Sequence, residues 1–222
     1  MILAGQVLVS DRKVVKAGAL VAEDAEIRLL GESMPYVSRG GLKLEAALRR
    51  FEIDVTGRTA LDVGASTGGF TDCLLRHGAK KVYAVDVGYG QTAWKLRQDP
   101  RVVLIERTNI RTLDPMLIPE PVDIAAIDVS FISLEKVIPH VMKLLSHSGE
   151  IVALIKPQFE VGKGQVGKGG IVRDETSRRA AVERIVEFVR RQGLDVKGLM
   201  QSPITGQEGN VEFLIHAVLR GE

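Results

Sequence analysis

The sequence predicts an α/β fold built on a seven-stranded, mostly parallel sheet. From residue 59 onward, short apolar segments alternate with amphipathic helical segments, which is the pattern of a doubly wound parallel sheet. The last two apolar segments, 194–202 and 211–219, are joined by a loop with no helix between them, so they should pair antiparallel. Numbered along the chain, the strands of such a sheet are expected in the order 3-2-1-4-5-7-6.

The residues before the sheet predict a small appendage. Residues 5–30 alternate apolar and polar side chains around turn signals, which predicts short strands. A linker is predicted over residues 31–35, because this stretch holds glycine, serine and proline. The expected units are therefore 1–33 and 34–222.

The main unit should begin with a helix and then alternate. Ser38 and two glycines precede an amphipathic helix that runs through Leu42 and Leu48. The next strands are expected at 59–64, 80–86, 101–105, 122–128 and 150–156, with helices at about 68–77, 132–147 and 174–192.

The composition excludes several classes of protein. With 222 residues, 45% of them hydrophobic and 26% charged, the chain can form one large domain and is not disordered. No apolar run is long enough to span a membrane and no secretory signal is visible, so we expect a cytoplasmic protein. The single cysteine excludes a disulfide, the four histidines lack ligand spacing, and no metal is expected. A net charge of +2 is too small to identify a nucleic-acid binder.

A glycine-rich turn after the first strand of the sheet is the main candidate ligand site. The residues are Asp62, Gly64, Ala65, Ser66, Thr67, Gly68, Gly69 and Phe70. Glycines let the backbone approach a ligand closely, and the following helix offers free N–H groups. The Gly-x-x-x-Gly-Gly spacing departs from the dinucleotide fingerprint, so a pyrophosphate is not favoured. Asp62 can face the positively charged groups of S-adenosylmethionine; the alternative is a turn that binds nothing.

Two further strand ends add candidate contacts to a nucleoside. Asp86, followed by Val87, closes the second strand, where an acid meets the ribose of a nucleotide-like cofactor in doubly wound sheets. Asn109 follows the third strand and is a weaker candidate for an adenine contact. A solvated charge at Asp86 and a simple turn at Asn109 are the alternatives.

The fourth and fifth strands bring a carboxylate and an amine to the same edge. Asp128 ends the fourth strand, and Lys156 ends the very apolar fifth strand. A lysine there loses hydration unless it has a partner or a task, and Asp128 is the obvious partner. The pair is therefore either catalytic or a structural ion pair.

Four motifs in order resemble those of one family. They are Tyr36-Val37-Ser38-Arg39-Gly40-Gly41-Leu42-Lys43-Leu44, the glycine-rich turn, Asp128-Val129-Ser130-Phe131 and Lys156-Pro157-Gln158-Phe159-Glu160. Together they resemble the TlyA family, whose members are named as hemolysins and act as ribosomal RNA 2′-O-methyltransferases related to FtsJ/RrmJ. The resemblance implies a Rossmann-like class I methyltransferase that uses S-adenosylmethionine on the ribose of cytidine in 16S or 23S rRNA, with ribosomal RNA or ribosomal subunits as partner.

The resemblance also implies a catalytic tetrad of Lys43, Asp128, Lys156 and Glu212. A ribose hydroxyl must be held close to the methyl donor and must lose its proton as the new bond forms. We expect Lys156 to orient and activate that oxygen, Lys43 to lower its proton affinity, and the two carboxylates to hold the amines. For Glu212 the alternative is an exposed position on an edge-like strand.

The remaining segments leave alternatives open. Residues 1–33 resemble the latter part of an S4 RNA-binding domain, whose opening helices are largely absent from this sequence. The segment 162–169 nearly spells a Walker loop but has Gly169 in place of Ser or Thr, so Lys163 and Lys168 either contact RNA phosphates or are solvated. The rival functions are a membrane-active hemolysin, an RNA-binding relative without catalysis, and an NAD-dependent oxidoreductase.

Overall fold

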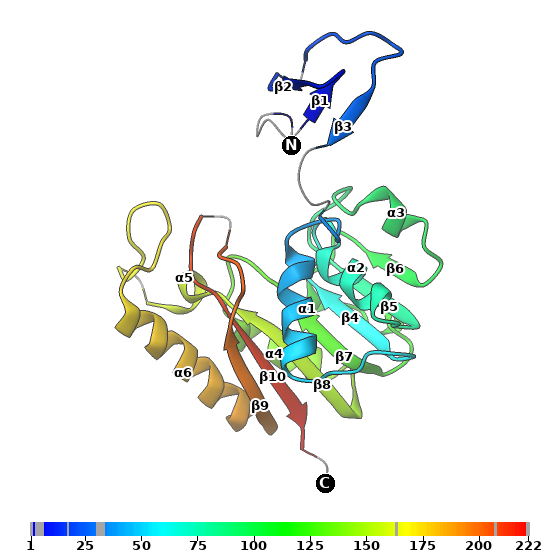
Figure 1. Ribbon diagram of the computed structural model, residues 1–222. Helices are drawn as coiled ribbons and strands as arrows, with labels where there is room; N and C mark the ends of the chain where they lie inside the picture. Colours follow the sequence, from blue (N-terminus) through cyan, green and yellow to red (C-terminus); the bar gives the residue numbers. More distant parts are fainter. Residues whose placement is uncertain are drawn as a thin grey trace. The chain divides into compact units, whose positions relative to one another are not determined.

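The computed structural model describes residues 2, 7–16, 18–29, 34–162, 164–206 and 208–220, and these fall into two compact units, Met1–Pro35 and Tyr36–Glu222 (Figure 1). Several predictions lie outside the described residues: the start of the S4-like segment at residues 3–6, residues 31–33 of the predicted linker, and Lys163.

The first unit contains a three-stranded antiparallel sheet. Its strands are β1 (Val7–Val9), β2 (Arg12–Val14) and β3 (Ile27–Leu29), in the order β2-β1-β3. Ser10 and Asp11 both have positive φ angles, as the two central residues of a tight hairpin require. The short strands were predicted; the S4-like character of this unit stays a prediction.

The second unit is built on a seven-stranded sheet. In spatial order its strands are β6 (Val102–Ile105), β5 (Lys81–Val85), β4 (Thr59–Val63), β7 (Val122–Ile127), β8 (Leu145–Ile155), β10 (Phe213–Leu219) and β9 (Leu194–Gln201). Strands β6 to β8 are parallel, and β10 is antiparallel to both β8 and β9. The order confirms the predicted 3-2-1-4-5-7-6, including the terminal hairpin.

Helices cover both faces of this sheet (Figure 1). On one face, α1 (Gly40–Arg50), α2 (Gly69–Arg76) and α3 (Trp94–Arg97) pack on inward residues such as Ala60 and Ile124. On the other face, α4 (Ile138–Met142) and α6 (Glu175–Arg191) pack on Leu61 and Ile127. Neighbouring residues of one strand thus serve opposite faces, which explains why these strands are apolar throughout. A short helix, α5 (Pro157–Glu160), follows β8 directly.

The helix predicted over 132–147 was wrong in its length. A 3₁₀ turn at Leu134–Lys136 precedes the five-residue α4, and β8 already begins at Leu145. Leu145 pairs with Val122 of β7, so strand pairing competes successfully with helix extension in a stretch of serines and Gly149. Two connections are also shorter than a regular alternation requires, since only α3 follows β5 and only the 3₁₀ turns Ile110–Thr112 and Pro115–Leu117 follow β6.

Candidate active site

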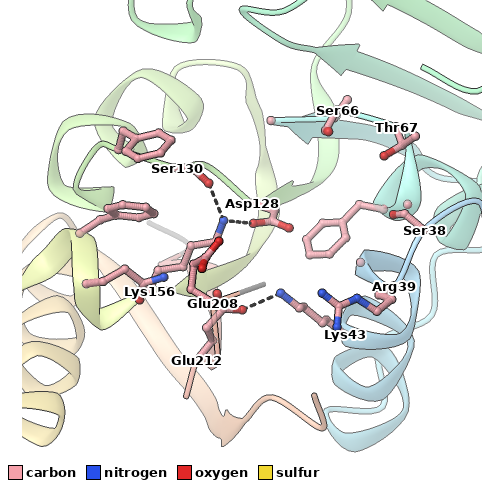
Figure 2. Close-up of a pocket in the computed structure, with 18 residues that line it drawn as sticks. Ser38, Arg39, Lys43, Ser66, Thr67, Asp128, Ser130, Lys156, Glu208 and Glu212 are labelled. Carbon is pink, nitrogen blue, oxygen red and sulfur yellow. Dashed lines mark hydrogen bonds and ion pairs between the residues drawn. The ribbon is translucent and has the colours of Figure 1, made fainter. Parts of the chain in front are cut away.

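A cavity of about 410 Å³ opens beside the carboxyl ends of β4, β7 and β8 (Figure 2). The ends of adjacent parallel strands meet there, and the start of α1, the start of α2 and the loop before β10 complete the wall. The lining residues are Ser38, Arg39, Gly40, Lys43, Gly64, Ala65, Ser66, Thr67, Gly69, Phe70, Asp128, Ser130, Phe131, Lys156, Gln158, Phe159, Glu208 and Glu212. All four residues of the predicted tetrad are among them.

Lys43 and Glu212 form a buried ion pair across one side of the cavity. The Lys43 amine donates to Glu212 Oε2 at 2.5 Å, although 169 residues separate the two in sequence. Lys43 is brought there by α1, and Glu212 lies directly before β10. Both side chains are almost fully buried, so each charge depends on the other for stabilisation. The alternative reading of Glu212 as an exposed strand position is wrong.

Lys156 and Asp128 form a second ion pair. Lys156 Nζ lies 2.6 Å from Asp128 Oδ1 and donates to Ser130 Oγ at 2.9 Å. Because β7 and β8 are parallel neighbours, the residues that follow them arrive side by side. Each of the two lysines therefore has its own carboxylate partner, Asp128 for Lys156 and Glu212 for Lys43.

The glycine-rich turn brings its backbone up to the end of β7. Gly64 has φ +88°, and a side chain there would collide with the carbonyl oxygen of Asp128. Gly68 caps α2 with φ +96°. Both positions combine a positive φ with a close approach, of Gly64 to the Asp128 carbonyl oxygen and of Gly68 to the Leu96 side chain, so glycine suits both. The N–H groups of the first turn of α2 start at this wall of the cavity.

A second cavity of about 440 Å³ lies on the other side of the same turn. It shares Gly64, Ser66, Asp128, Ser130 and Phe131 with the first cavity, and it is lined in addition by Asp86, Val87 and Asn109. A molecule with an amino-acid end and a nucleoside end has a place for each end here. The residues present thus fit S-adenosylmethionine.

Two of these predicted contacts already have partners within the chain. Asp86 accepts hydrogen bonds from the N–H groups of Ser66 at 2.7 Å and Gly88 at 2.6 Å. Asn109 Oδ1 accepts from the Arg111 N–H at 3.1 Å and so caps a 3₁₀ turn, as the alternative reading expected, while it also lines the second cavity.

Asp62 and Gly68 do not line either cavity. Asp62 is fully buried behind the turn, where its Oδ2 accepts from the N–H and hydroxyl of Thr71 at 2.9 and 2.6 Å. Burial raises the pKa of Asp62 to about 7, and the nearby carboxylates of Asp128 and Asp86 add to the rise. Its Oδ1 has no hydrogen-bond partner among the described residues. A buried acid of this kind fits a position next to a cationic ligand.

Several lining residues were not predicted as site residues: Ser38, Arg39, Ser130, Phe131, Gln158, Phe159 and Glu208. Phe131 is the most unusual, since it is 91% exposed, has φ +62° and lines both cavities. Its ring lies 5.0 Å from that of Phe159. In the sequence, Phe131 stood out as the last residue of the motif Asp128-Val129-Ser130-Phe131, and periodicity gives it no role. Glu208 sits in a loop that carries no strong pattern.

Two negative findings, on metal sites and on membrane-spanning helices, apply to the residues that the structure describes. No three His, Cys, Asp or Glu side chains are grouped so that they could hold a metal ion. No described helix combines the length and the apolar character that crossing a bilayer requires.

The chain has close relatives among known proteins. Residues 36–219 match the family described as FtsJ-like methyltransferase. The 16S/23S rRNA (cytidine-2′-O)-methyltransferase TlyA of Mycobacterium tuberculosis is 47% identical over 216 residues, which cover 97% of this chain and 81% of that protein. Hemolysin A of Brachyspira hyodysenteriae is 43% identical over 220 residues, covering 99% of this chain and 91% of that protein. A solved structure from Streptococcus thermophilus that carries a hemolysin name is 46% identical with a TM-score of 0.85, covering 98% of this chain and 80% of that chain.

These matches agree with the fold and with the motifs. The hemolysin name and the rRNA methyltransferase name occur among relatives of similar identity, so they label one family. The predicted resemblance, the predicted enzyme class and the predicted donor, S-adenosylmethionine, are thereby confirmed, and the chain belongs to the FtsJ-like methyltransferase family.

Proposed function

We propose that this chain transfers a methyl group from S-adenosylmethionine to the ribose 2′-hydroxyl of cytidine in ribosomal RNA. The observation that carries the proposal is the pair of ion pairs, Lys156–Asp128 and Lys43–Glu212, in one cavity beside the glycine-rich turn. The substrate follows the name of the Mycobacterium tuberculosis relative, which acts on cytidine 2′-oxygens of 16S and 23S rRNA.

The tetrad can position a ribose hydroxyl for methyl transfer and can accept its proton. Lys156 has two partners, Asp128 and Ser130, so its third N–H can donate to the ribose oxygen and hold it in line for displacement. A hydrogen bond from an ammonium group also stabilises the oxygen as it loses its proton. The carboxylate of Asp128 accepts this proton. The Lys43–Glu212 ion pair holds the opposite wall of the cavity in place, and its two charges cancel.

The two cavities would hold different ends of the donor. S-adenosylmethionine supplies an electrophilic methyl group carried on a sulfonium. Gly64, Ala65, Ser66, Thr67, Gly69 and Phe70 would hold its amino-acid end, and Asp86, Val87 and Asn109 its nucleoside end. The full burial of Asp62, with its pKa raised to about 7 by that burial, supports a role behind the turn, where it balances the positive charge of the donor without touching solvent.

The exposed Phe131 supports an unpaired base as part of the substrate. An aromatic side chain that is 91% exposed in a strained backbone conformation is costly unless it has a task. Together with Phe159 it offers a stacking surface at the mouth of the cavity, and bases that are read by proteins outside a duplex stack on such rings. The target nucleotide would therefore be turned out of its helix.

Recognition of the larger RNA is assigned to the first unit. We propose that residues 1–33 act as a partial S4-like RNA-binding unit and that residues 34–222 form the methyltransferase unit. The family match over 36–219 and the separate small sheet support this division. Acting on ribosomal RNA, the enzyme would work in the cytoplasm on ribosomal subunits.

Transfer of a labelled methyl group tests the proposal. Purified protein is incubated with tritiated S-adenosylmethionine and separately with 30S subunits, 50S subunits and free ribosomal RNA, and label is mapped by mass spectrometry of the nucleosides. The expected product is 2′-O-methylcytidine. Label on a base, or no label on any of the three substrates while the donor is bound, would contradict the proposal.

A further inference from the structure

One contact outside the tetrad links two loops beside the cavity. The glycine-rich loop (residues 161–173) follows α5, and the β9–β10 loop (residues 202–212) carries Glu208 and Glu212. Asn210 lies between those two glutamates and is only 2% exposed. Nothing in the reaction described so far uses it.

The side-chain amide of Asn210 holds the glycine-rich loop at two points. Its Nδ2 donates to the carbonyl oxygen of Gly170 at 2.8 Å, and its Oδ1 accepts from the N–H of Val172 at 3.0 Å. These partners are 40 and 38 residues away in sequence. Val172 is fully buried, so its N–H would be left without a partner if the amide were removed. The amide therefore fixes one loop on the other.

The backbone of Asn210 continues this connection toward the tetrad. Its carbonyl oxygen accepts from the Gly206 N–H at 2.9 Å. Gly206 in turn lies directly against the Glu212 carboxylate, since a side chain at that position would come within 2.5 Å of Glu212 Oε1. The position of the Glu212 carboxylate, and with it the ion pair to Lys43, thus depends on how this loop is held.

The other end of the connection presents positive charge. Lys168 and Arg173 are exposed on the glycine-rich loop, and neither forms an ion pair with a described residue. The loop nearly matches a phosphate-binding motif, and exposed cations of this kind bind the backbone phosphates of RNA. Five glycines in the segment 162–170 give it the freedom to adapt.

We propose that Asn210 is a positioning residue that couples the RNA-contacting glycine-rich loop to the Lys43–Glu212 pair. RNA phosphates that bind the loop then fix the geometry of the tetrad at the moment the ribose enters. The inference rests on the proposed function, because it takes RNA as the substrate.

Two variants and a matched control test the coupling. Asn210→Ala removes both hydrogen bonds, and Asn210→Asp keeps the acceptor for Val172 but loses the donor to Gly170. Ser202→Ala is the control, because Ser202 is also buried in the β9–β10 loop but its hydroxyl donates within that loop, to the carbonyl oxygen of Ile204 at 2.7 Å. The substitution leaves the backbone hydrogen bond from the Ser202 N–H to the Glu212 carbonyl oxygen in place. For each protein, kcat and KM for ribosomal RNA, the affinity for S-adenosylhomocysteine and the unfolding temperature are measured.

The expected result is a loss of RNA methylation and of RNA binding, without a loss of donor binding. Asn210→Ala should lower kcat on the order of tenfold and raise KM for RNA, with S-adenosylhomocysteine affinity within about twofold of the wild type. Asn210→Asp should lose less, and it decides the question if the alanine variant does not fold. Ser202→Ala should lower the unfolding temperature but leave kcat unchanged. Hydrogen exchange at the Val172 amide should accelerate in Asn210→Ala, which lacks the acceptor, and not in Ser202→Ala.

A double variant distinguishes energetic coupling between Lys168 and Asn210 from a general destabilisation of the loop. Lys168→Ala should raise KM for RNA in the wild-type background and have almost no further effect in Asn210→Ala. Additive effects, an equal loss of kcat in Ser202→Ala, or wild-type turnover in both Asn210 variants would each overturn the proposal. A wild-type protein that methylates no RNA contradicts the proposed function instead, so the two failures are distinguishable.

Discussion

The charged side chains of the reaction cavity balance one another. The cations Arg39, Lys43 and Lys156 face the carboxylates of Asp128, Glu208 and Glu212. Two of the three cations are held in ion pairs of 2.5 and 2.6 Å. Such pairing lets amines remain charged in a partly buried place, and it fixes their direction before a substrate arrives.

Lys156 provides the sharpest test of this arrangement. Lys156→Ala should reduce methyl transfer on the order of 10²- to 10⁴-fold, because the group that orients the ribose oxygen is lost. Lys156→Arg should be clearly more active than the alanine variant, since arginine keeps a positive hydrogen-bond donor. Single-turnover rates measure both, with S-adenosylhomocysteine affinity as the control. If the two variants were equally inactive, we would instead assign Lys156 as the group that accepts the proton.

Asp62 predicts a pH dependence of stability. Burial raises the pKa of Asp62 to about 7 in the folded protein, above the value of about 4 in an unfolded chain. Ionising it therefore opposes folding, and this penalty grows as pH rises from about 4 and is complete above about pH 7. Asp62→Asn keeps an acceptor for Thr71 and never ionises.

The Asp62→Asn variant should be more stable than the wild type, by roughly 3 kcal/mol more at pH 8 than at pH 5, at about 1.4 kcal/mol per unit of pKa shift. Urea unfolding of both proteins without donor, at the two pH values, measures this difference. An identical gain at both pH values would show that Asp62 is ionised throughout.

At the scale of elements, the turn between β4 and α2 determines whether the donor can be held. Gly64→Ala places a methyl group against the carbonyl oxygen of Asp128 and should weaken binding of S-adenosylhomocysteine at least tenfold. Gly57→Ala is the matched control, because Gly57 also has a positive φ but would have open space around its new side chain. Calorimetric titration distinguishes them. Equal weakening in both would point to backbone strain alone, at about 1–3 kcal/mol.

Elements with a repeating pattern could be predicted from the sequence, and elements fixed by distant contacts could not. The apolar runs ending at Asp128 and Lys156 predicted two parallel strands, and parallel strands necessarily bring those residues together. The helix over 132–147 failed because pairing of Leu145 with β7 is invisible in local propensity. For the same reason the Asn210 contacts could not be predicted, because their partners lie 38 and 40 residues away. Glu212 was found only through the family resemblance.

At the scale of the whole molecule, the division into two units predicts that donor binding and binding of ribosomal subunits can be separated. Deleting residues 1–33 should leave S-adenosylhomocysteine affinity within about twofold, because both cavities are lined only by residues from Ser38 onward. Affinity for ribosomal subunits should fall and depend less on salt, since contacts to phosphates are lost. Calorimetry and filter binding measure the two. Loss of donor binding in the shortened chain would show that the boundary near residue 34 is misplaced.

The position of β10 has a consequence for biosynthesis. Strand β10 follows β9 in the sequence but lies between β8 and β9 in the sheet, so β9 has no place in the sheet until residues 213–219 have left the ribosome. A premature stop codon that removes these residues would release two strands, expose the apolar edge of β8 and leave Glu212 at a frayed terminus. The cavity that holds the Lys43–Glu212 pair can therefore be completed only after residues 213–219 have been synthesised.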